Sequence, residues 1–217
     1  MRRLAPIVGL MLALGAARAE GVPAPDTADV VRGLQTWLDG TKTFEARFRQ
    51  SLLSGALGAQ TIETGRLYLE RPGKLRWDYL DPDRKVAILV GRRTELYLED
   101  EHELHRGVLS DEAGIFPKLL AGDGRVADLF DAALVAPPQG VRGDIALKLT
   151  PRAAGAAVSE VVLMLHRGDD AITSALVLDE MGNRTSYEFS QPKRNGKLPV
   201  GIFAFEPPPG TEILAEP

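Results

Sequence analysis

The chain has 217 residues, of which 44% are hydrophobic and 26% charged, and its formal net charge is −4 at pH 7. This composition is ordinary for a single globular domain, and an acidic balance without a Lys/Arg cluster argues against nucleic acid or an anionic lipid surface as a partner. The absence of cysteine excludes disulfides, thiolate metal sites, thiol nucleophiles and a lipid-modified N-terminal cysteine.

Residues 1–19 have the three parts of a secretory signal peptide. Two arginines follow the first methionine, residues 7–14 form an apolar run too short to span a bilayer, and Ala17 and Ala19 are the small residues that a signal peptidase reads. We therefore expect cleavage after Ala19 and a single mature domain over residues 20–217. The removed segment holds three arginines and no acidic residue, so the net charge falls from −4 to −7.

An amphipathic helix is predicted at the start of the mature chain. Asp26 or Thr27 can cap its N-terminus, and Gly40 ends it. The apolar side chains that share one stripe of this helix are Val30, Leu34, Trp37 and Leu38. Such a stripe has to be buried, so the helix must pack on the structure that the rest of the chain forms.

Most of the remaining chain alternates apolar and polar residues with the two-residue period of β-strands. Short turns rich in Gly, Pro and Asp separate the runs, which indicates that consecutive strands pair in an antiparallel manner. The runs, about ten in number, cover residues 44–49, 67–69, 75–79, 86–90, 95–99, 145–150, 160–167, 174–179, 185–190 and 202–206. A sheet of this size tends to curl or to close towards a barrel.

A helical insert is predicted within residues 110–131, where apolar residues recur at spacings of three and four on either side of Gly122 and Gly124. With the opening helix, the insert needs an apolar surface, and the open mouth of an incomplete barrel offers one. Residues 87–90 and 161–165 carry aliphatic side chains on both faces of the sheet. Two interpretations remain open here: a ligand cavity beneath a helical lid, or ordinary burial of both faces.

Sequence motifs for catalysis are absent. The chain has three histidines and neither a Gly-x-Ser-x-Gly nor a His-Glu-x-x-His motif, so we expect no enzymatic activity, no cofactor and no metal. His102 and His105 could be read as metal ligands, but residues three apart in a strand point to opposite faces of a sheet. We expect them to be surface residues of an acidic hairpin instead.

Three segments occur in an order that covers almost the whole mature chain. A Phe-x-Gln strand lies at residues 44–50, the run Gly65–Tyr79 contains an Arg-Pro-Gly-Lys turn, and the chain closes with a Phe-x-Pro-Pro-x-Gly motif within residues 203–210. Together with the opening helix and the helical insert, this order resembles the LolA family of periplasmic carriers of outer-membrane lipoproteins.

The resemblance implies a mainly β fold with helices (α+β): an incomplete, unclosed antiparallel β-barrel of about ten to eleven strands, with a helical lid over a hydrophobic cavity for acyl chains. It implies that Arg71 is a latch, a side chain that holds the lid shut through hydrogen bonds to the lid backbone. The expected cavity residues are Phe48, Leu67, Leu69, Leu75, Trp77, Tyr79 and Leu89. The expected lid residues are Ile115, Phe116, Leu119 and Leu120. The alternative is that these apolar residues are plain core and that Arg71 is an ordinary turn residue.

The resemblance further implies a monomeric periplasmic chaperone. Its cargo would be acylated lipoproteins, received from an inner-membrane ABC-type lipoprotein-releasing complex and delivered to an outer-membrane lipoprotein acceptor. The alternatives are a carrier of another lipid or glycolipid, and a periplasmic lipoprotein-sensing protein.

Three features depart from the family pattern. The predicted lid contains Pro117 and ends near Gly122, and the segment at residues 100–107 is unusually acidic. Few residues follow Gly210, so we expect no additional C-terminal strand.

Overall fold

The computed structural model describes residues 25–109, 115–122, 124–138, 141 and 143–215, and leaves out the side chains of residues 115 and 116. The predicted signal segment, residues 1–19, lies outside the described residues. The helices are α1 (Thr27–Asp39), α2 (Ile115–Ala121) and α3 (Val126–Leu129). The strands are β1 (Thr43–Leu53), β2 (Gln60–Glu70), β3 (Lys74–Asp81), β4 (Lys85–Val90), β5 (Arg93–Leu98), β6 (Glu103–Val108), β7 (Phe130–Val135), β8 (Ile145–Pro151), β9 (Val158–Leu165), β10 (Ile172–Asp179), β11 (Arg184–Arg194) and β12 (Glu212–Ala215). None of the described helices has the length and apolar character needed to span a membrane.

The opening helix forms where the sequence predicts it. Asp26 is the N-cap, its side chain accepting a hydrogen bond from the Ala28 N–H, and Gly40 is the C-cap. The buried residues of α1 are Val30, Leu34 and Leu38, which belong to the predicted apolar stripe. Trp37, also on that stripe, is partly buried against the same core.

All twelve strands belong to one sheet, in which β1 pairs with β11 and so joins the two halves of the chain. The order is β12-β6-β5-β4-β3-β2-β1-β11-β10-β9-β8-β7. Neighbouring strands are antiparallel except β12 and β6, which are parallel. Because β12 and β7 are both edges, the sheet is an unclosed barrel, as predicted, although it has twelve strands and not ten or eleven.

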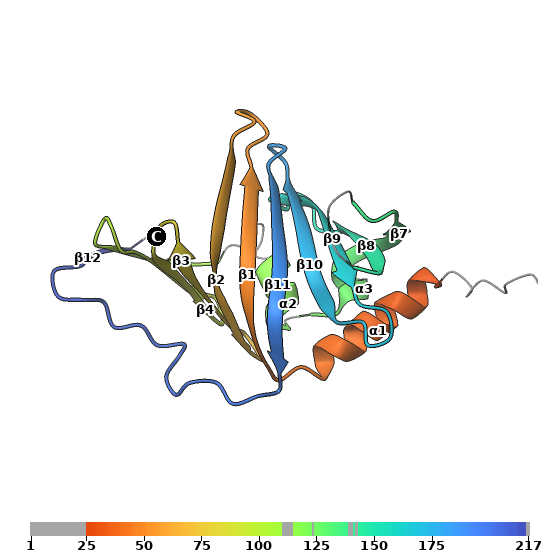
Figure 1. Cartoon of the computed structure of the whole chain (residues 1–217), viewed down its shortest axis with the longest axis horizontal. Helices are drawn as coiled ribbons and strands as arrows, with labels where there is room; N and C mark the ends of the chain where they lie inside the picture. The colour runs from red at the N-terminus through yellow and green to blue at the C-terminus, as the bar shows by residue number, and fades with distance from the viewer. Residues whose placement is uncertain (1–24, 110–114, 123, 139–140, 142, 216–217) are drawn as a thin grey trace, which may run out of the picture.

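The concave face of the sheet carries the helices and the main hydrophobic core (Figure 1). In Figure 1, α2 lies behind β1 and β11, and α1 crosses below β9 and β10. The alternation of β1 explains this arrangement, because Phe44, Ala46 and Phe48 are buried in the core while Arg47 and Arg49 between them are exposed. The fold therefore places an apolar floor beneath the predicted lid.

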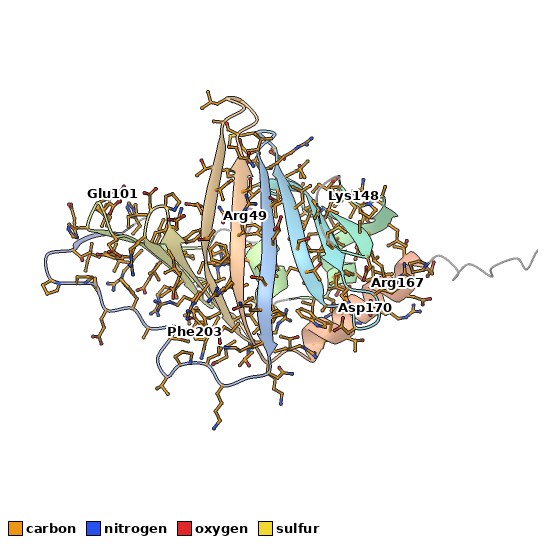
Figure 2. All side chains as sticks on the ribbon, in the orientation of Figure 1. Arg49, Glu101, Lys148, Arg167, Asp170 and Phe203 are labelled. Carbon is orange, nitrogen blue, oxygen red and sulfur yellow. The ribbon has the colours of Figure 1, made fainter. Side chains whose placement is uncertain are left out.

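The chain after β11 crosses the convex face of β3 to β6, which corrects two expectations. The predicted strand at residues 202–206 does not form: the Arg76 guanidinium donates to the Ile202 carbonyl at 2.7 Å, and the Phe205 ring lies 4.9 Å from that of Tyr97. Lys74 Nζ lies 5.7 Å from the centre of the Phe203 ring (Figure 2). The additional C-terminal strand, expected to be absent, is present as β12.

Both faces of the sheet are buried at the two aliphatic runs that left the sequence interpretation open. Ile88 and Leu89 are buried on opposite faces of β4, the first beside the convex surface and the second in the main core. On β9, Val162 and Met164 form a second, smaller cluster with Ala146. Burial of both faces is thus part of the fold, and it coexists with the apolar floor under the helices.

The helical insert consists of two short helices, α2 and α3, as predicted. It ends earlier than expected, because Phe130 and Asp131 already belong to β7, a strand that the sequence pattern did not reveal. The N–H of Val126 donates to the Gln35 side chain on α1 at 2.9 Å, so the first helix caps the last one.

The stability of the fold is expected to depend on the contact between α1 and the sheet. Leu34 is fully buried, so Leu34→Ala should lower the free energy of unfolding by about 2–5 kcal/mol in a urea titration. Leu57 is 82% exposed, and Leu57→Ala should change it by less than about 0.5 kcal/mol. Equal losses for the two variants would show that α1 adds no more to stability than an exposed loop side chain.

Candidate functional site

Arg71, in the turn between β2 and β3, meets the carbonyl end of the lid helix α2. Its Nη2 donates to the carbonyl oxygens of Leu120 at 2.7 Å and Leu119 at 3.2 Å. Two residues on, the N–H of Gly73 donates to the carbonyl of Ala121 at 3.0 Å. The last carbonyls of a helix lack partners within the helix and carry the negative end of its dipole, so a guanidinium is a well-suited partner for them.

The Arg71 side chain is partly buried, which makes its charged form less favourable than in water although it stays protonated at neutral pH. Burial lowers the pKa of the guanidinium to about 10, against a smaller opposing effect of the Asp39 carboxylate. Its Nε is buried and has no hydrogen-bond partner among the described residues. A buried donor without a partner destabilises the closed arrangement, so the contact is specific without being fully satisfied. That the contact opens during function stays a prediction.

Gly122, one of the departures from the family pattern, leaves room for this guanidinium. The residue has a φ of +82°, in the region that glycine adopts without strain just after a helix. A Cβ at this position would lie 2.5 Å from Arg71 Nη1. The glycine therefore both ends α2 and leaves space for the Arg71 guanidinium.

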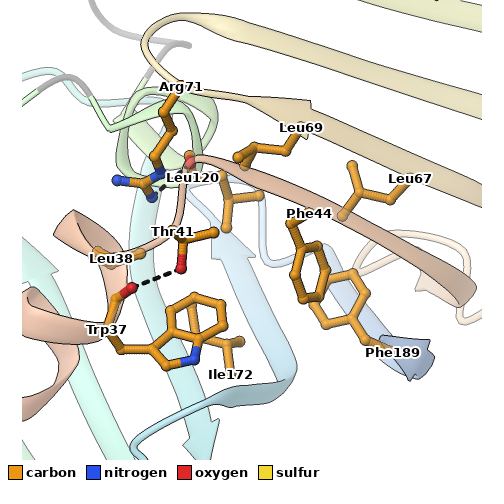
Figure 3. A pocket seen from close by; sticks show the side chains of 10 residues that line it. All are labelled: Trp37, Leu38, Thr41, Phe44, Leu67, Leu69, Arg71, Leu120, Ile172 and Phe189. Carbon is orange, nitrogen blue, oxygen red and sulfur yellow. Dashed lines mark hydrogen bonds between the residues drawn. The ribbon is translucent and has the colours of Figure 1, made fainter. Parts of the chain in front are cut away.

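A small apolar pocket lies between α1, α2 and the concave face of the sheet (Figure 3). Its lining residues are Trp37, Leu38, Thr41, Phe44, Leu67, Leu69, Arg71, Leu120, Ile172 and Phe189. The space left between them is about 20 Å³, roughly what one water molecule needs. Thr41 Oγ1 donates to the Trp37 carbonyl at 2.6 Å, so the two polar side chains of the lining, Arg71 and Thr41, are both engaged. What the lining offers a ligand is therefore apolar surface.

The predicted site residues lie on this concave face but only in part around the pocket. Leu67 and Leu69 line the pocket, whereas Leu75, Leu89 and Phe48 are buried elsewhere in the same core. The two predicted aromatic residues of β3, Trp77 and Tyr79, are partly buried against that core.

The predicted lid residues divide in the same way. Leu119 and Leu120 are buried beneath α2, and Leu120 lines the pocket. The side chains of Ile115 and Phe116 lie outside the described residues.

Six lining residues were missing from the predicted site: Trp37, Leu38, Thr41, Phe44, Ile172 and Phe189. Trp37 and Phe44 already stood out as apolar members of the opening helix and the first strand. Ile172 and Phe189 reach the site because β11 pairs with β1, and no local signal in the sequence predicts that pairing.

His102 and His105, the two histidines considered as metal ligands from the sequence, lie at the hairpin between β5 and β6. His102 lies in the turn before β6, and His105 on β6 contacts the Glu103 carboxylate at 3.0 Å, which agrees with the acidic hairpin expected. Among the described residues, no three His, Asp or Glu side chains gather closely enough to hold a metal ion.

A substitution at Gly122 tests whether the position of the Arg71 guanidinium requires a residue without a Cβ. Gly122→Ala should displace the Arg71 guanidinium and loosen α2, because the added Cβ would overlap Nη1. We expect trypsin to cleave after Lys118 or Arg125 several-fold faster, since cleavage follows local opening of the helix.

Gly155→Ala is the matched control. Gly155 has a φ of +73°, and its Cβ would meet no atom within 4 Å, so it carries the backbone strain without the clash. Equal cleavage rates after Lys118 and Arg125 in the two variants would contradict the assignment.

Comparison with known proteins identifies the family. Residues 39–206 match the family described as outer membrane lipoprotein carrier protein LolA. The chain is 31% identical to an outer-membrane lipoprotein carrier protein of Pseudomonas aeruginosa across 100% of both chains. It is 29% identical to one of Chromobacterium violaceum across 92% of this chain and 94% of that protein.

A solved structure agrees with the fold. An uncharacterized conserved protein from Thermus thermophilus superposes with a TM-score of 0.52 at 15% identity, over 87% of this chain and 98% of that one. The extent of the family match, together with the unclosed sheet and its helical lid, shows that the chain belongs to the LolA family of outer membrane lipoprotein carrier proteins.

Proposed function

We propose that the mature chain carries the acyl chains of outer-membrane lipoproteins on its concave face, one lipoprotein at a time. The observation that supports this most directly is the contact of Arg71 with the carbonyls of Leu119 and Leu120. It holds a short helix with buried leucines over an apolar floor, through a few hydrogen bonds at one end. Such a helix can leave the floor as a unit and expose apolar surface to a ligand.

The energetics of acyl chains explain why a carrier needs a helix of this kind. Each buried methylene contributes about 0.8 kcal/mol, so three acyl chains in water cost on the order of 30 kcal/mol. A carrier that gained all of this energy would never release its cargo. When cargo displaces Leu119, Leu120 and Ala121 from the floor, their lost packing offsets part of the gain, and a partner of higher affinity can then take the cargo.

The proposed pathway places the chain in the periplasm as a monomer, after cleavage of the signal peptide behind Ala19. An inner-membrane ABC-type lipoprotein-releasing complex supplies the cargo, and an outer-membrane lipoprotein acceptor receives it. Transfer down a gradient of affinity forms and breaks no covalent bond, so the proposal assigns the chain no catalytic role. The family description of the match supports the cargo class, and the resemblance noted in the sequence supports the two partners.

The cargo is testable by native mass spectrometry of protein produced in a bacterial periplasm and purified without detergent. We expect a one-to-one complex with a triacylated peptide or lipoprotein, identified by extraction of the bound lipid. A different lipid bound at the same stoichiometry would support the proposed binding face but would show that the cargo is not a lipoprotein. An empty protein that also fails to bind added lipopeptide would contradict the carrier function and favour a sensing or purely structural role.

The latch is testable by Arg71→Leu. This variant should keep its fold but transfer a fluorescent lipopeptide to phosphatidylethanolamine/phosphatidylglycerol vesicles at least about tenfold more slowly. The reason is that the closed lid loses hydrogen bonds to a charged donor, each worth about 1.5–3 kcal/mol, and the loaded state is favoured.

Arg49→Leu, at an exposed arginine of β1 (Figure 2), is the control and should transfer at the rate of the unaltered protein. An unchanged rate for Arg71→Leu would remove the latch and leave the carrier function in place.

A further inference from the structure

A row of polar side chains crosses the concave face at the end remote from the latch. Its members are Gln50 on β1, Glu63 on β2, Tyr79 on β3 and Lys85 on β4, and we call these four residues the polar row. Gln50 is paired with Glu63 across β1 and β2, and Tyr79 with Lys85 across β3 and β4. Directly paired residues share a face, and Gln50 and Tyr79 each follow a floor aromatic by two positions, so the row faces the floor.

The polar row is joined by hydrogen bonds, and two of its members are buried while Tyr79 and Lys85 are half-buried. Gln50 and Glu63 are only 8% and 9% exposed. Lys85 Nζ donates to Glu63 Oε1 at 2.5 Å, and Gln50 Nε2 donates to Glu63 Oε2 at 3.0 Å. The Tyr79 hydroxyl donates to Gln50 Oε1 at 3.0 Å, and Lys85 Nζ also lies 4.4 Å from the centre of the Tyr79 ring.

Aromatic side chains lie between the polar row and the apolar floor near the latch. The Phe48 ring packs edge-on against those of Trp77, at 4.8 Å, and Tyr79, at 5.0 Å. Towards the latch, the floor continues with Leu67 and Leu69. Glu63 lies eight positions before Arg71 along the extended chain of β2, which corresponds to about 26 Å. The concave face therefore changes from polar at one end to apolar, aromatic and aliphatic, along the rest of its length, which matches an amphiphile with its polar group at one end.

Stability alone does not account for a buried ion pair on this face. A buried pair contributes little net stability compared with apolar side chains of the same size, because two charges have to be desolvated. The row does, however, retain unused donors. Among the described residues, Lys85 uses one of its three N–H bonds on Glu63, and Gln50 uses one of its two. Burial also raises the pKa of Tyr79, so its hydroxyl stays protonated at neutral pH.

We propose that the polar row binds the ester and amide carbonyl groups that join the acyl chains of the cargo to its head. This proposal rests on the carrier function. A carbonyl oxygen accepts hydrogen bonds only, and it must find a donor when the chains beside it are buried. Lys85 Nζ and Gln50 Nε2 supply those donors, and the acyl chains lie along the aromatic and aliphatic floor towards the space that α2 vacates.

The test compares two synthetic lipopeptides with identical alkyl chains, one joined to its glyceryl-cysteine head by esters and the other by ethers. The ether compound lacks the ester carbonyl oxygens, keeps its amide groups and has the same apolar surface. We expect the unaltered protein to bind the ester compound at least about tenfold more tightly, as one hydrogen bond to a charged donor would give. The double variant Glu63→Met/Lys85→Met removes both charges together, so that neither charge is left buried without its partner. In this variant the preference for the ester compound should fall to about twofold or less.

The control is Arg84→Met/Glu99→Met, which removes an exposed ion pair of 3.2 Å at the turn after β3 and should keep the full preference. Circular dichroism checks that both double variants fold. If the unaltered protein binds the two compounds equally, or if the Glu63→Met/Lys85→Met variant keeps the preference, the polar row is not the site and the carrier function stands. If neither compound binds the unaltered protein, the carrier function fails and the proposal fails with it.

Discussion

In the proposed carrier, the closed form depends on one guanidinium placed against the end of one short helix. Arg71 donates to the carbonyls of Leu119 and Leu120, and the Leu120 side chain lines the pocket, where only about 20 Å³ remains open. The contact is costly as well as specific, because burial lowers the pKa of the guanidinium and its Nε lacks a partner among the described residues. A helix held in this way can be displaced by a ligand that offers the floor more apolar surface than Leu119 and Leu120 do.

The sheet provides the apolar concave face that α2 covers. Pairing of β1 with β11 joins two runs of antiparallel strands into one curved surface whose ends never meet, so the concave face stays open at both edges. On the convex face, the segment after β11 covers Tyr97 with Phe205 and ends as β12 beside β6. This segment covers part of the convex apolar surface, although Leu80 on β3 stays 47% exposed, and movement of α2 would expose apolar surface on the concave face.

The features of the fold and of the candidate site that the sequence predicts are those that depend on local sequence patterns. The stripe of α1, the alternation of β1 and the turn that holds Arg71 are local patterns, and each is found where expected. Residues 202–206 alternate like a strand, but they pack their rings across the sheet, and periodicity cannot tell the two apart. Phe189 and Ile172 join the pocket through the pairing of distant strands, and the role of Gly122 emerges only once Arg71 is placed beside it.

The central claim is that the lid helix and the cargo occupy the same floor in turn. Hydrogen–deuterium exchange at the backbone amides of α2, followed during titration with a triacylated lipopeptide, tests this claim most directly. The account predicts that α2 loses protection in proportion to the bound lipopeptide, while the paired central strands β1 and β2 keep theirs. Saturating binding with α2 fully protected would mean that cargo lies elsewhere on the molecule, and it would contradict the account.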